Sequence, residues 1–225
     1  MSQIISGIAR YLSDDVAALD VISQNVANMR TAGYRAERLK PDFRSGVLSG
    51  TPTLDLADGT MDHTGASLDL AIQGTGFFVV SVDGREMLTR NGMFHIDANQ
   101  QLVDAAGHAV LGQSGPITLA HSDVHIDATG QIRDGNDAID TLRVVGVDAP
   151  DQLREAGGGL YTYGRSPADW NGSIHQGALE QSNVDPGNEM VRLMELTRHA
   201  QSVQRAILAY DQAMQSGINH LGDNS

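Results

Sequence analysis

The stretch Phe77-Phe-Val-Val-Ser-Val-Asp-Gly-Arg-Glu-Met-Leu-Thr-Arg90 contains two runs of strand-forming residues on either side of Asp83-Gly84. Phe, Val and Thr favour extended backbone, and an Asp-Gly pair between two such runs is a strong signal for a tight turn. The stretch therefore predicts a β-hairpin, and with it a β-rich middle of the chain.

Short runs of the same character continue on both sides of this hairpin. Between residues 68 and 182 they are separated by turn residues, and the further strands are expected at 94–96, 101–103, 109–111, 117–119, 124–126, 142–147 and 160–163. Gly157-Gly158-Gly159 forms a flexible break before the last of them. Many short strands at this spacing predict an all-β domain.

One of these segments occurs twice. Phe94-His-Ile-Asp-Ala-Asn-Gln-Gln-Leu-Val-Asp104 matches Val124-His-Ile-Asp-Ala-Thr-Gly-Gln-Ile-Arg-Asp134. Both copies predict strand, turn and strand. A single repeated hairpin is too little for a repeat architecture, which needs at least about three units. The repeated segment therefore supports a small β domain and nothing more.

The N-terminal segment has the apolar period of an amphipathic helix. Steps of three and four residues, the spacing of a heptad seam, connect Ile5, Ile8, Leu12, Leu19, Ile22, Val26 and Met29. Asp15 interrupts this stripe, either at an imperfect contact or as a polar residue that sets register. Thr31-Ala32-Gly33 ends the predicted helix, because glycine suits the left-handed turn that follows a helix.

The C-terminal segment repeats this design. Asp185 is a suitable cap, and Pro186 suits the first helical position. The apolar stripe that follows comprises Leu193, Leu196, Ala200, Val203, Ile207, Tyr210, Met214 and Leu221. Met190, Met194, Leu208 and Ile218 widen the stripe, so this helix needs more than one neighbour.

These patterns predict an α+β fold in which the N- and C-terminal α-helices pack as a coiled-coil domain around a central all-β domain. Residues 1–33 with 186–225 are expected to form the helical assembly domain, residues 34–67 an extended connector with a β-hairpin, and residues 68–185 the β domain. The alternative is that the helices cover the chain's own sheet. Their place at the two ends and a period near ~3.5 residues favour helical partners.

Charge is unevenly distributed along the chain. The net charge is −13, and all of it lies in residues 45–187, which carry six basic against nineteen acidic groups. So acidic a surface disfavours nucleic acid and anionic membranes as partners. The absence of cysteine excludes disulfides and thiol chemistry. We expect neither membrane insertion, because no apolar run is long enough, nor a cleaved signal peptide.

The sequence contains no recognisable catalytic, cofactor or metal motif. His121 and His125 would stand about 13 Å apart on a strand at ~3.3 Å per residue, too far to share an ion. Asp134-Gly-Asn-Asp137 resembles the start of a calcium loop, but Ala138 occupies a ligand position and no glutamate closes the loop. Glycine pairs at 74–76 and 112–115 lack the context or spacing of a dinucleotide fingerprint and a nucleophile elbow. We therefore predict no catalytic residue, no cofactor and no metal.

Several segments resemble the bacterial flagellar rod and hook protein family. Ser23-Gln-Asn-Val-Ala-Asn-Met-Arg-Thr-Ala-Gly-Tyr-Arg-Ala36 is similar to the end of the family's first helix. Residues 68–80 and 89–94 are similar to its central motifs, and residues 177–194 to the beginning of its last helix. The residues that carry the resemblance are Asn25, Asn28, Thr31, Gly33, Tyr34, Asp69, Gly74, Gly76, Phe77, Phe78, Arg90, Asn91, Gly92, Ser182, Asn183, Glu189 and Met190.

The resemblance implies a structural subunit of the flagellar basal-body rod rather than an enzyme. It implies export through the flagellar type III apparatus without signal cleavage, and a place in the rod within the periplasmic space. The implied partners are other rod proteins and further copies of the chain. Tyr34-Arg-Ala36 favours the proximal over the distal rod proteins. The alternatives are a distal rod protein, or an acidic periplasmic β-domain enzyme that uses its helices to dimerise.

Overall fold

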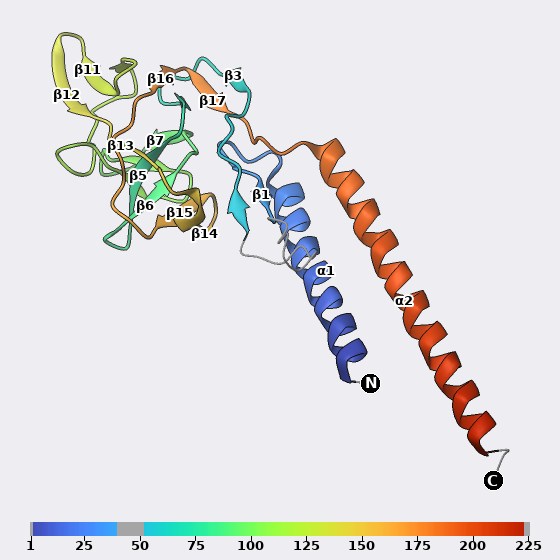
Figure 1. The fold of residues 1–225 in the computed structure, drawn as a ribbon. Coiled ribbons are helices and arrows are strands. Elements are labelled where there is room, and N and C mark those ends of the chain that lie inside the picture. Colours follow the sequence, from blue (N-terminus) through green and yellow to red (C-terminus); the bar gives the residue numbers. More distant parts are fainter. Residues whose placement is uncertain (1, 40–51, 223–225) are drawn as a thin grey trace. The chain divides into compact units, whose positions relative to one another are not determined.

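The computed structural model describes residues 2–39 and 52–222 of the chain. The chain divides into two units, coloured along the sequence in Figure 1. The helical unit contains the terminal helices, within Met1–Val26 and Asp185–Ser225, and the β unit is formed by Ala27–Arg38 and Thr53–Val184.

The helical unit contains two long helices, α1 (Ser2–Asn28) and α2 (Pro186–Gly222), where the sequence predicts them. The predicted cap of α2 is confirmed, because the Oδ1 atom of Asp185 accepts hydrogen bonds from the N–H groups of Gly187 (2.8 Å) and Asn188 (3.3 Å). Neither helix, over its described residues, combines the length and apolar character needed to cross a membrane.

The predicted coiled coil between the two terminal helices is wrong. Three seam residues of α1 stay between 40% and 43% exposed, namely Leu12, Leu19 and Val26. A coiled coil requires the seam side chains of each helix to insert between those of the other. The two helices instead touch at His199 of α2, whose Nδ1 lies 2.9 Å from the Asp15 carboxylate and whose ring packs edge-on against Tyr11. Heptad spacing shows that a helix has an apolar stripe, but it does not identify the partner.

The β unit is built from short antiparallel strands. They are β1 (Glu37–Arg38), β2 (Thr53–Leu54), β3 (Met61–His63), β4 (Leu70–Gln73), β5 (Gly76–Val82), β6 (Arg85–Thr89), β7 (Phe94–Ile96), β8 (Leu102–Asp104), β9 (Ala109–Val110), β10 (His125–Ile126), β11 (Gln131–Asp134), β12 (Asp137–Thr141), β13 (Val144–Gly146), β14 (Leu153–Gly157), β15 (Leu160–Tyr163), β16 (Ser173–Gln176) and β17 (Ala178–Glu180), with a 3₁₀ turn at Pro150–Gln152. Seven of them form the path of one large sheet in the order β14-β15-β6-β5-β9-β8-β7, and β13 also pairs with β5.

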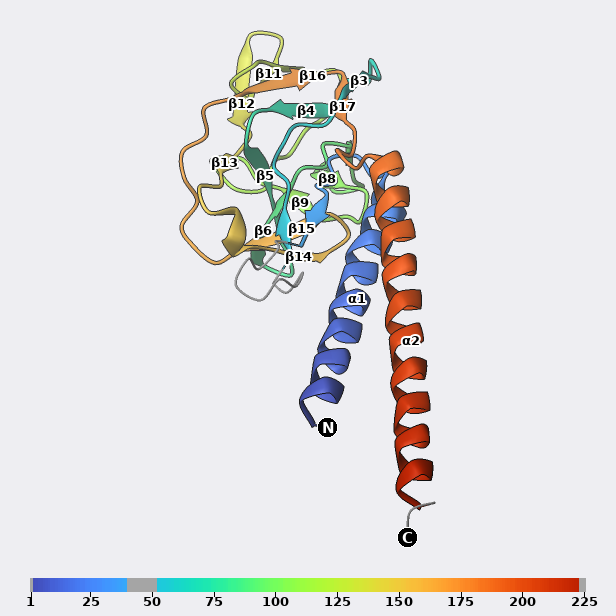
Figure 2. The ribbon, with the colours of Figure 1, turned by 45° about the vertical axis from the view of Figure 1, so that its right-hand side comes forward.

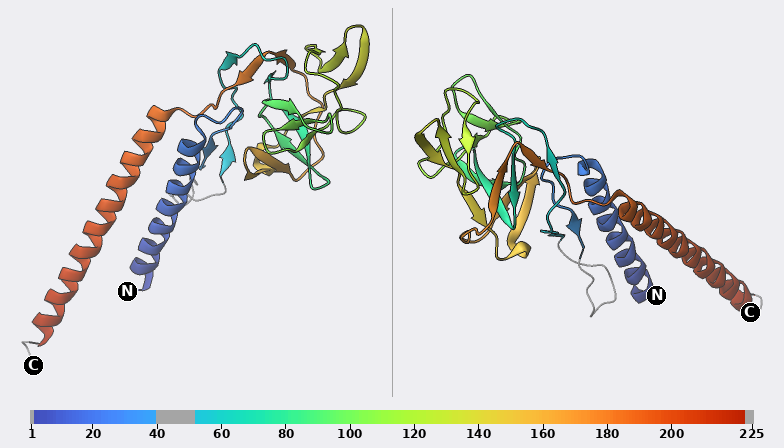
Figure 3. Two further views of the ribbon diagram at one scale, coloured as in Figure 1. Left: turned by 180° about the vertical axis from the view of Figure 1, so that it is seen from behind. Right: turned by 90° about the horizontal axis from the view of Figure 1, so that it is seen from above.

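The last two strands of the β unit pair with β3 and β4, which come early in the chain. β16 lies beside β4 in Figure 2, and the two are antiparallel with Gln176 opposite Leu70. β17 pairs in the same way with β3. A separate three-stranded sheet, β10-β11-β12, ends in the hairpin of β11 and β12 that projects from the unit in Figure 3.

The predicted hairpin is confirmed as β5 and β6. Val80 lies opposite Met87 and Val82 opposite Arg85. The turn residues Asp83 and Gly84 both have positive φ, 50° and 77°. Two such residues in succession define the turn type that matches the natural twist of a hairpin, which explains why this pair joins the strands.

β5 is buried on both faces. Successive side chains of a strand point to opposite faces, so Phe78 and Val80 enter one hydrophobic cluster with Leu102 and Ile132. Phe77 and Val79 enter another, together with Leu88 and Tyr161. The apolar run Phe77–Val80 therefore contributes side chains to two hydrophobic cores, one on each face of β5.

The repeated segment forms two equivalent turns, and the structure reveals a third. In each, the Oδ1 atom of an aspartate accepts hydrogen bonds from the N–H groups two and four residues further on, at Asp97, Asp104 and Asp127. The residue three positions after each aspartate has positive φ, namely Gln100, Gly107 and Gly130. The third copy escapes sequence comparison because its turn reads Asp104-Ala-Ala-Gly-His108, which shares little beyond the aspartate.

The turn at Asp127 predicts a loss of stability in acid. The hydrogen bond from the Thr129 hydroxyl, with those of two backbone N–H groups, holds the pKa of Asp127 below its ordinary value. A group with a lowered folded-state pKa stabilises the fold above its unfolded pKa, and this contribution is lost as the pH falls through the folded pKa. Urea unfolding should show Asp127→Asn less stable than the wild type at neutral pH, with the gap closing as the pH falls below the ordinary pKa of an aspartate. A gap that persists in acid, or an equal gap for the exposed Asp123→Asn, would contradict this.

Candidate assembly interface and its anchoring cluster

The segment that follows α1 and the segment that precedes α2 lie side by side in the β unit. The N–H of Gly33 donates to the carbonyl oxygen of Glu180 at 2.7 Å, and the N–H of Asn183 donates to the carbonyl oxygen of Tyr34 at 3.4 Å. The side chain of Asn183 adds a bond, because its Oδ1 accepts from the N–H of Ala36 at 2.7 Å. The chain therefore enters and leaves the β unit at adjacent points.

Gly33 is required at its place by both conformation and space. Its φ of 69° is left-handed, and a Cβ atom there would lie 2.4 Å from the carbonyl carbon and oxygen of Arg90. The predicted helix stop at Gly33 is wrong, because α1 already ends at Asn28; the left-handed Gly33 serves the contact with the rest of the β unit instead. It lets the backbone after the helix press directly against the end of the central hairpin.

Arg90 is the centre of a buried network. Its side chain is fully buried, and its Nε donates to Glu180 Oε2 at 2.5 Å. The remaining guanidinium nitrogens donate to Asp58 Oδ1 at 3.1 Å and to the backbone carbonyl oxygens of Ile72, Gly74 and Gly76. One arginine thus donates hydrogen bonds to three backbone carbonyl groups where β4 leads into β5, and it connects this segment to β17 through Glu180.

Arg35 completes a cluster of two cations and two anions. Its NH1 lies 3.0 Å from Glu180 Oε1 and its NH2 3.1 Å from Asp58 Oδ1, so the two carboxylates are shared between the two arginines. Burial, followed by the positive charge of Arg35, lowers the pKa of Arg90, and Glu180 opposes this shift. Arg35, Arg90 and Glu180 are buried, whereas the Asp58 side chain is 38% exposed, so the three buried charges depend on one another for their stability.

Asn183 and Tyr161 brace the same junction. The Nδ2 of Asn183 donates to the carbonyl oxygens of Asp55 (2.9 Å) and Ala57 (2.8 Å), next to Asp58. The backbone N–H of Arg35 donates to the Tyr161 hydroxyl, and burial raises the pKa of that phenol. We name Arg35, Asp58, Arg90, Glu180 and Asn183 the anchoring cluster.

The structure brings many of the predicted motif residues to this cluster. Gly33, Tyr34, Gly74, Gly76, Arg90 and Asn183 contribute atoms to it directly. Gly92 lies next to it and accepts a hydrogen bond from the N–H of Leu70, and Asn91 holds the same turn through its Oδ1. Asp69 bridges to Met93, Thr31 bonds Asn28, and the Ser182 hydroxyl accepts from the N–H of Val184. Phe77 and Phe78 lie in the two cores.

Three motif residues belong to the helical unit instead. Asn25 and Glu189 are fully buried, and Glu189 lies 3.7 Å from Arg192 of the next turn. Met190 is 57% exposed. Their roles as family markers stay predictions.

The predicted interface residues differ in exposure. On α1, Ile22 is buried beside Ala18 and Val21, whereas Leu12, Leu19 and Val26 are exposed. Met29 lies beyond the end of α1 and packs in the β unit with Tyr34, Ala36 and Val184. On α2, the half-buried residues are Leu193, Leu196, Ala200, Val203, Ile207 and Tyr210. The side chains of Ile5, Ile8, Met214 and Leu221 lie outside the described part of the structure.

Arg35, Asp58 and Glu180 were not identified from the sequence. Charged residues are normally exposed, so pattern reasoning places them on the surface. The available signal was Glu180 at the end of the run Gly177-Ala-Leu-Glu180 and Arg90 after a hydrophobic strand, two opposite charges at strand ends. Nothing local indicates that positions so far apart in the sequence meet.

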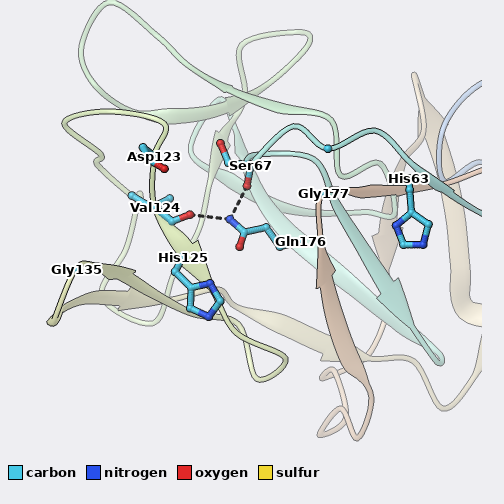
Figure 4. Close-up of a pocket in the computed structure, with 9 residues that line it drawn as sticks. His63, Ser67, Asp123, Val124, His125, Gly135, Gln176 and Gly177 are labelled. Carbon is cyan, nitrogen blue, oxygen red and sulfur yellow. Dashed lines mark hydrogen bonds between the residues drawn. The ribbon is translucent and has the colours of Figure 1, made fainter.

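A cavity of about 620 Å³ opens elsewhere in the β unit. Figure 4 shows His63, Ser67, His125 and Gln176 among its lining residues. The Nε2 of Gln176 donates to the carbonyl oxygens of Ser67 and Val124, and its Oε1 accepts from the N–H of Ile126. The amide at its centre is therefore fully engaged in holding β10 to the rest of the unit, and offers no free group to a ligand.

Two family models match the chain. The flagellar hook protein FlgE/F/G D1 domain matches residues 71–134, and the flagellar basal body rod FlgEFG protein C-terminal region matches residues 175–220. The first match covers the central hairpin with Arg90, and the second covers the last strands with Glu180 and most of α2.

Proteins similar to the chain over most of its length are named as flagellar basal-body rod proteins. The flagellar basal-body rod protein FlgF of Caulobacter vibrioides is 32% identical over 91% of both chains. FlgF of Salmonella typhimurium is 31% identical over 85% of this chain and 87% of its own. The flagellar basal-body rod protein FlgG of Bacillus subtilis is 28% identical over 96% of both chains.

The contact of Gly33 with Arg90 predicts an unusually costly glycine substitution. Gly33→Ala should lower the free energy of unfolding by about 2–3 kcal/mol, because the backbone must move in addition to adopting a strained φ. Gly65→Ala is the matched control, since Gly65 has a similar φ of 75° but open space around its Cβ position, and should cost only about 1 kcal/mol. Urea unfolding of both variants gives the comparison, and equal losses would refute the crowding argument.

The anchoring cluster predicts that one buried arginine matters far more than an exposed one. Arg90→Met should cost about 3–5 kcal/mol, because it leaves Glu180 short of a partner and buried carbonyl oxygens unsatisfied. Arg143→Met removes an ion pair with Glu86 whose two side chains are 38% and 56% exposed, and should cost about 0–1 kcal/mol. Thermal and urea unfolding measure both, and comparable losses would count against the cluster.

Proposed function

The chain belongs to the flagellar basal-body rod proteins of the FlgF type, and on this premise we propose that it assembles into the proximal rod through the apolar faces of α1 and α2. The family is structural, so the chain is a structural subunit rather than an enzyme. It is located in the flagellar basal body, where it assembles with other rod and hook components.

One observation supports the helix faces as the assembly surface. Large apolar side chains between 40% and 61% exposed follow both helices, at Leu12, Val16, Leu19, Val26, Met190, Val191, Met194 and Leu208. A row of such side chains on a helix marks a surface that another protein covers. Each gains on the order of 1 kcal/mol on burial, so a few of them give a substantial driving force.

The width of the apolar surface on α2 indicates more than one neighbour. Its half-buried residues, such as Leu196 and Val203, occupy one face, whereas the exposed Met194 and Leu208 extend the apolar surface beyond it. A surface of this width fits several helices packed around it better than a single one. We infer that further copies of the chain are among these neighbours.

The route to the rod is part of the same proposal. Export through the flagellar type III apparatus without signal cleavage, and a final position in the periplasmic part of the rod, follow from the family resemblance. The acidic middle of the chain, with six basic against nineteen acidic groups, supports a subunit that binds neither nucleic acid nor an anionic membrane surface.

The proposal predicts that a charge on either helix face blocks assembly without unfolding the β unit. Leu19→Asp or Ile207→Asp should abolish incorporation and motility in a strain whose own copy of the gene is deleted, because each buries an unpaired carboxylate in the contact. Circular dichroism of the purified variants should retain the β signal.

The matched controls place the same charge on exposed positions beside the stripes. Ser13→Asp on α1 and Gln204→Asp on α2 should leave motility intact. If cells with Leu19→Asp and cells with Ile207→Asp are both motile, or if the control variants lose as much motility, the helix faces are not the assembly surface.

A further inference from the structure

Two Asn-Gly pairs occur in the chain, Asn91-Gly92 and Asn171-Gly172. This dipeptide is chemically special because the backbone nitrogen that follows the asparagine is unhindered by a side chain. When the chain is free to rotate, that nitrogen attacks the preceding carboxamide. Because the two dipeptides are identical, a difference between their reaction rates must come from the surrounding structure.

The fold holds the first pair in place. The N–H of Asn91 donates to the Thr89 hydroxyl at 3.1 Å, and the Asn91 Oδ1 accepts from the N–H of Met93 at 3.0 Å. Gly92 is buried, and a Cβ atom there would lie 1.7 Å from the carbonyl oxygen of Leu70. The carboxamide and the peptide that would attack it are both fixed, next to the anchoring cluster.

The second pair lacks these hydrogen bonds, although Gly172, like Gly92, packs closely against its neighbours. Asn171 and Gly172 are exposed and lie in the irregular segment between β15 and β16. Among the described residues, neither the Asn171 carboxamide nor the N–H of Gly172 has a hydrogen-bond partner. Backbone that is exposed and carries no hydrogen bonds samples other conformations at low cost.

We propose that Asn171 is a site of spontaneous deamidation. The backbone nitrogen of Gly172 attacks Cγ of Asn171 to form a new N–Cγ bond, the Cγ–Nδ2 bond breaks, and ammonia leaves with the proton from the Gly172 nitrogen. The product is a five-membered succinimide. One water molecule then opens either carbonyl of the ring, giving aspartate at position 171 or its isoaspartate isomer.

The isoaspartate isomer changes the backbone next to the closely packed Gly172. The Cα of Gly172 lies so close to its surroundings that a Cβ there would be 2.2 Å from the Gln73 carbonyl oxygen and 2.5 Å from the Trp170 Nε1. Isoaspartate adds one methylene carbon to the main chain immediately before this point. Ser173, the residue after Gly172, forms the first pair of β16 with β4, opposite Gln73. The added carbon therefore disturbs the start of this pairing.

The test is a time course on the purified full-length protein at mildly alkaline pH, followed by tryptic digestion and tandem mass spectrometry. Trypsin places the two sites in separate peptides, because Arg90 precedes the first pair and Arg165 precedes the second. In the folded protein, conversion at Asn171 should be faster than at Asn91 by a factor on the order of ten or more. In denaturing urea both sites should convert at similar rates.

Two variants keep the result interpretable. Asn171→Gln should abolish conversion in the second peptide, because a glutamine would require a larger and slower ring. Asn171→Asp, which carries one of the two products from the start, should fold with an unchanged β signal and serves as the mass-spectrometric standard. Equal rates at the two sites in the folded protein, or an unconverted Asn171 while the urea sample reacts, would overturn the proposal.

Discussion

Two buried arginines, the buried carboxylate of Glu180 and the partly exposed carboxylate of Asp58, from four distant parts of the chain, hold the β unit together at its junctions. Arg35 follows α1, Asp58 lies in the connector, Arg90 ends the central hairpin and Glu180 ends the last strand. A buried charge without its partner costs several kcal/mol, so Arg35, Arg90 and Glu180 are tolerated in their buried positions only because opposite charges lie beside them. This mutual dependence explains why the loop at Gly74 and Gly76, the turn at Gly33 and the amide of Asn183 all converge on one place.

Local signals in the sequence carried part of this architecture. The Asp83-Gly84 hairpin and the capped start of α2 at Asp185 depend on neighbouring residues, and both are confirmed. The left-handed conformation of Gly33 is also present, but α1 ends before it, at Asn28. The pairing of β16 with β4 and of β17 with β3 was not predicted, because it joins segments about a hundred residues apart. No periodicity within either segment encodes its partner. The anchoring cluster was invisible for a related reason, since a buried charge looks in sequence like an exposed one.

The terminal helices show how far a periodic pattern can be taken. Their positions were correct to within a few residues, yet the inference that they cover each other was wrong, and α1 keeps Leu12 and Leu19 exposed. The family comparison supplied what periodicity could not, membership of a rod protein family that assembles with other rod and hook components. Asp15, which interrupts the stripe, has a partner in His199 of α2, so its polarity is used within the chain.

The adjacency of the two junction segments has a mechanical consequence. A pull or twist passed along the backbone from one terminal helix to the other reaches the β unit at Gly33 and leaves it at Asn183, and hydrogen bonds join these segments directly. These bonds and the charges beside them form the shortest connection through the β unit between the two helices, so tension between the helices acts on them before it acts on the large sheet.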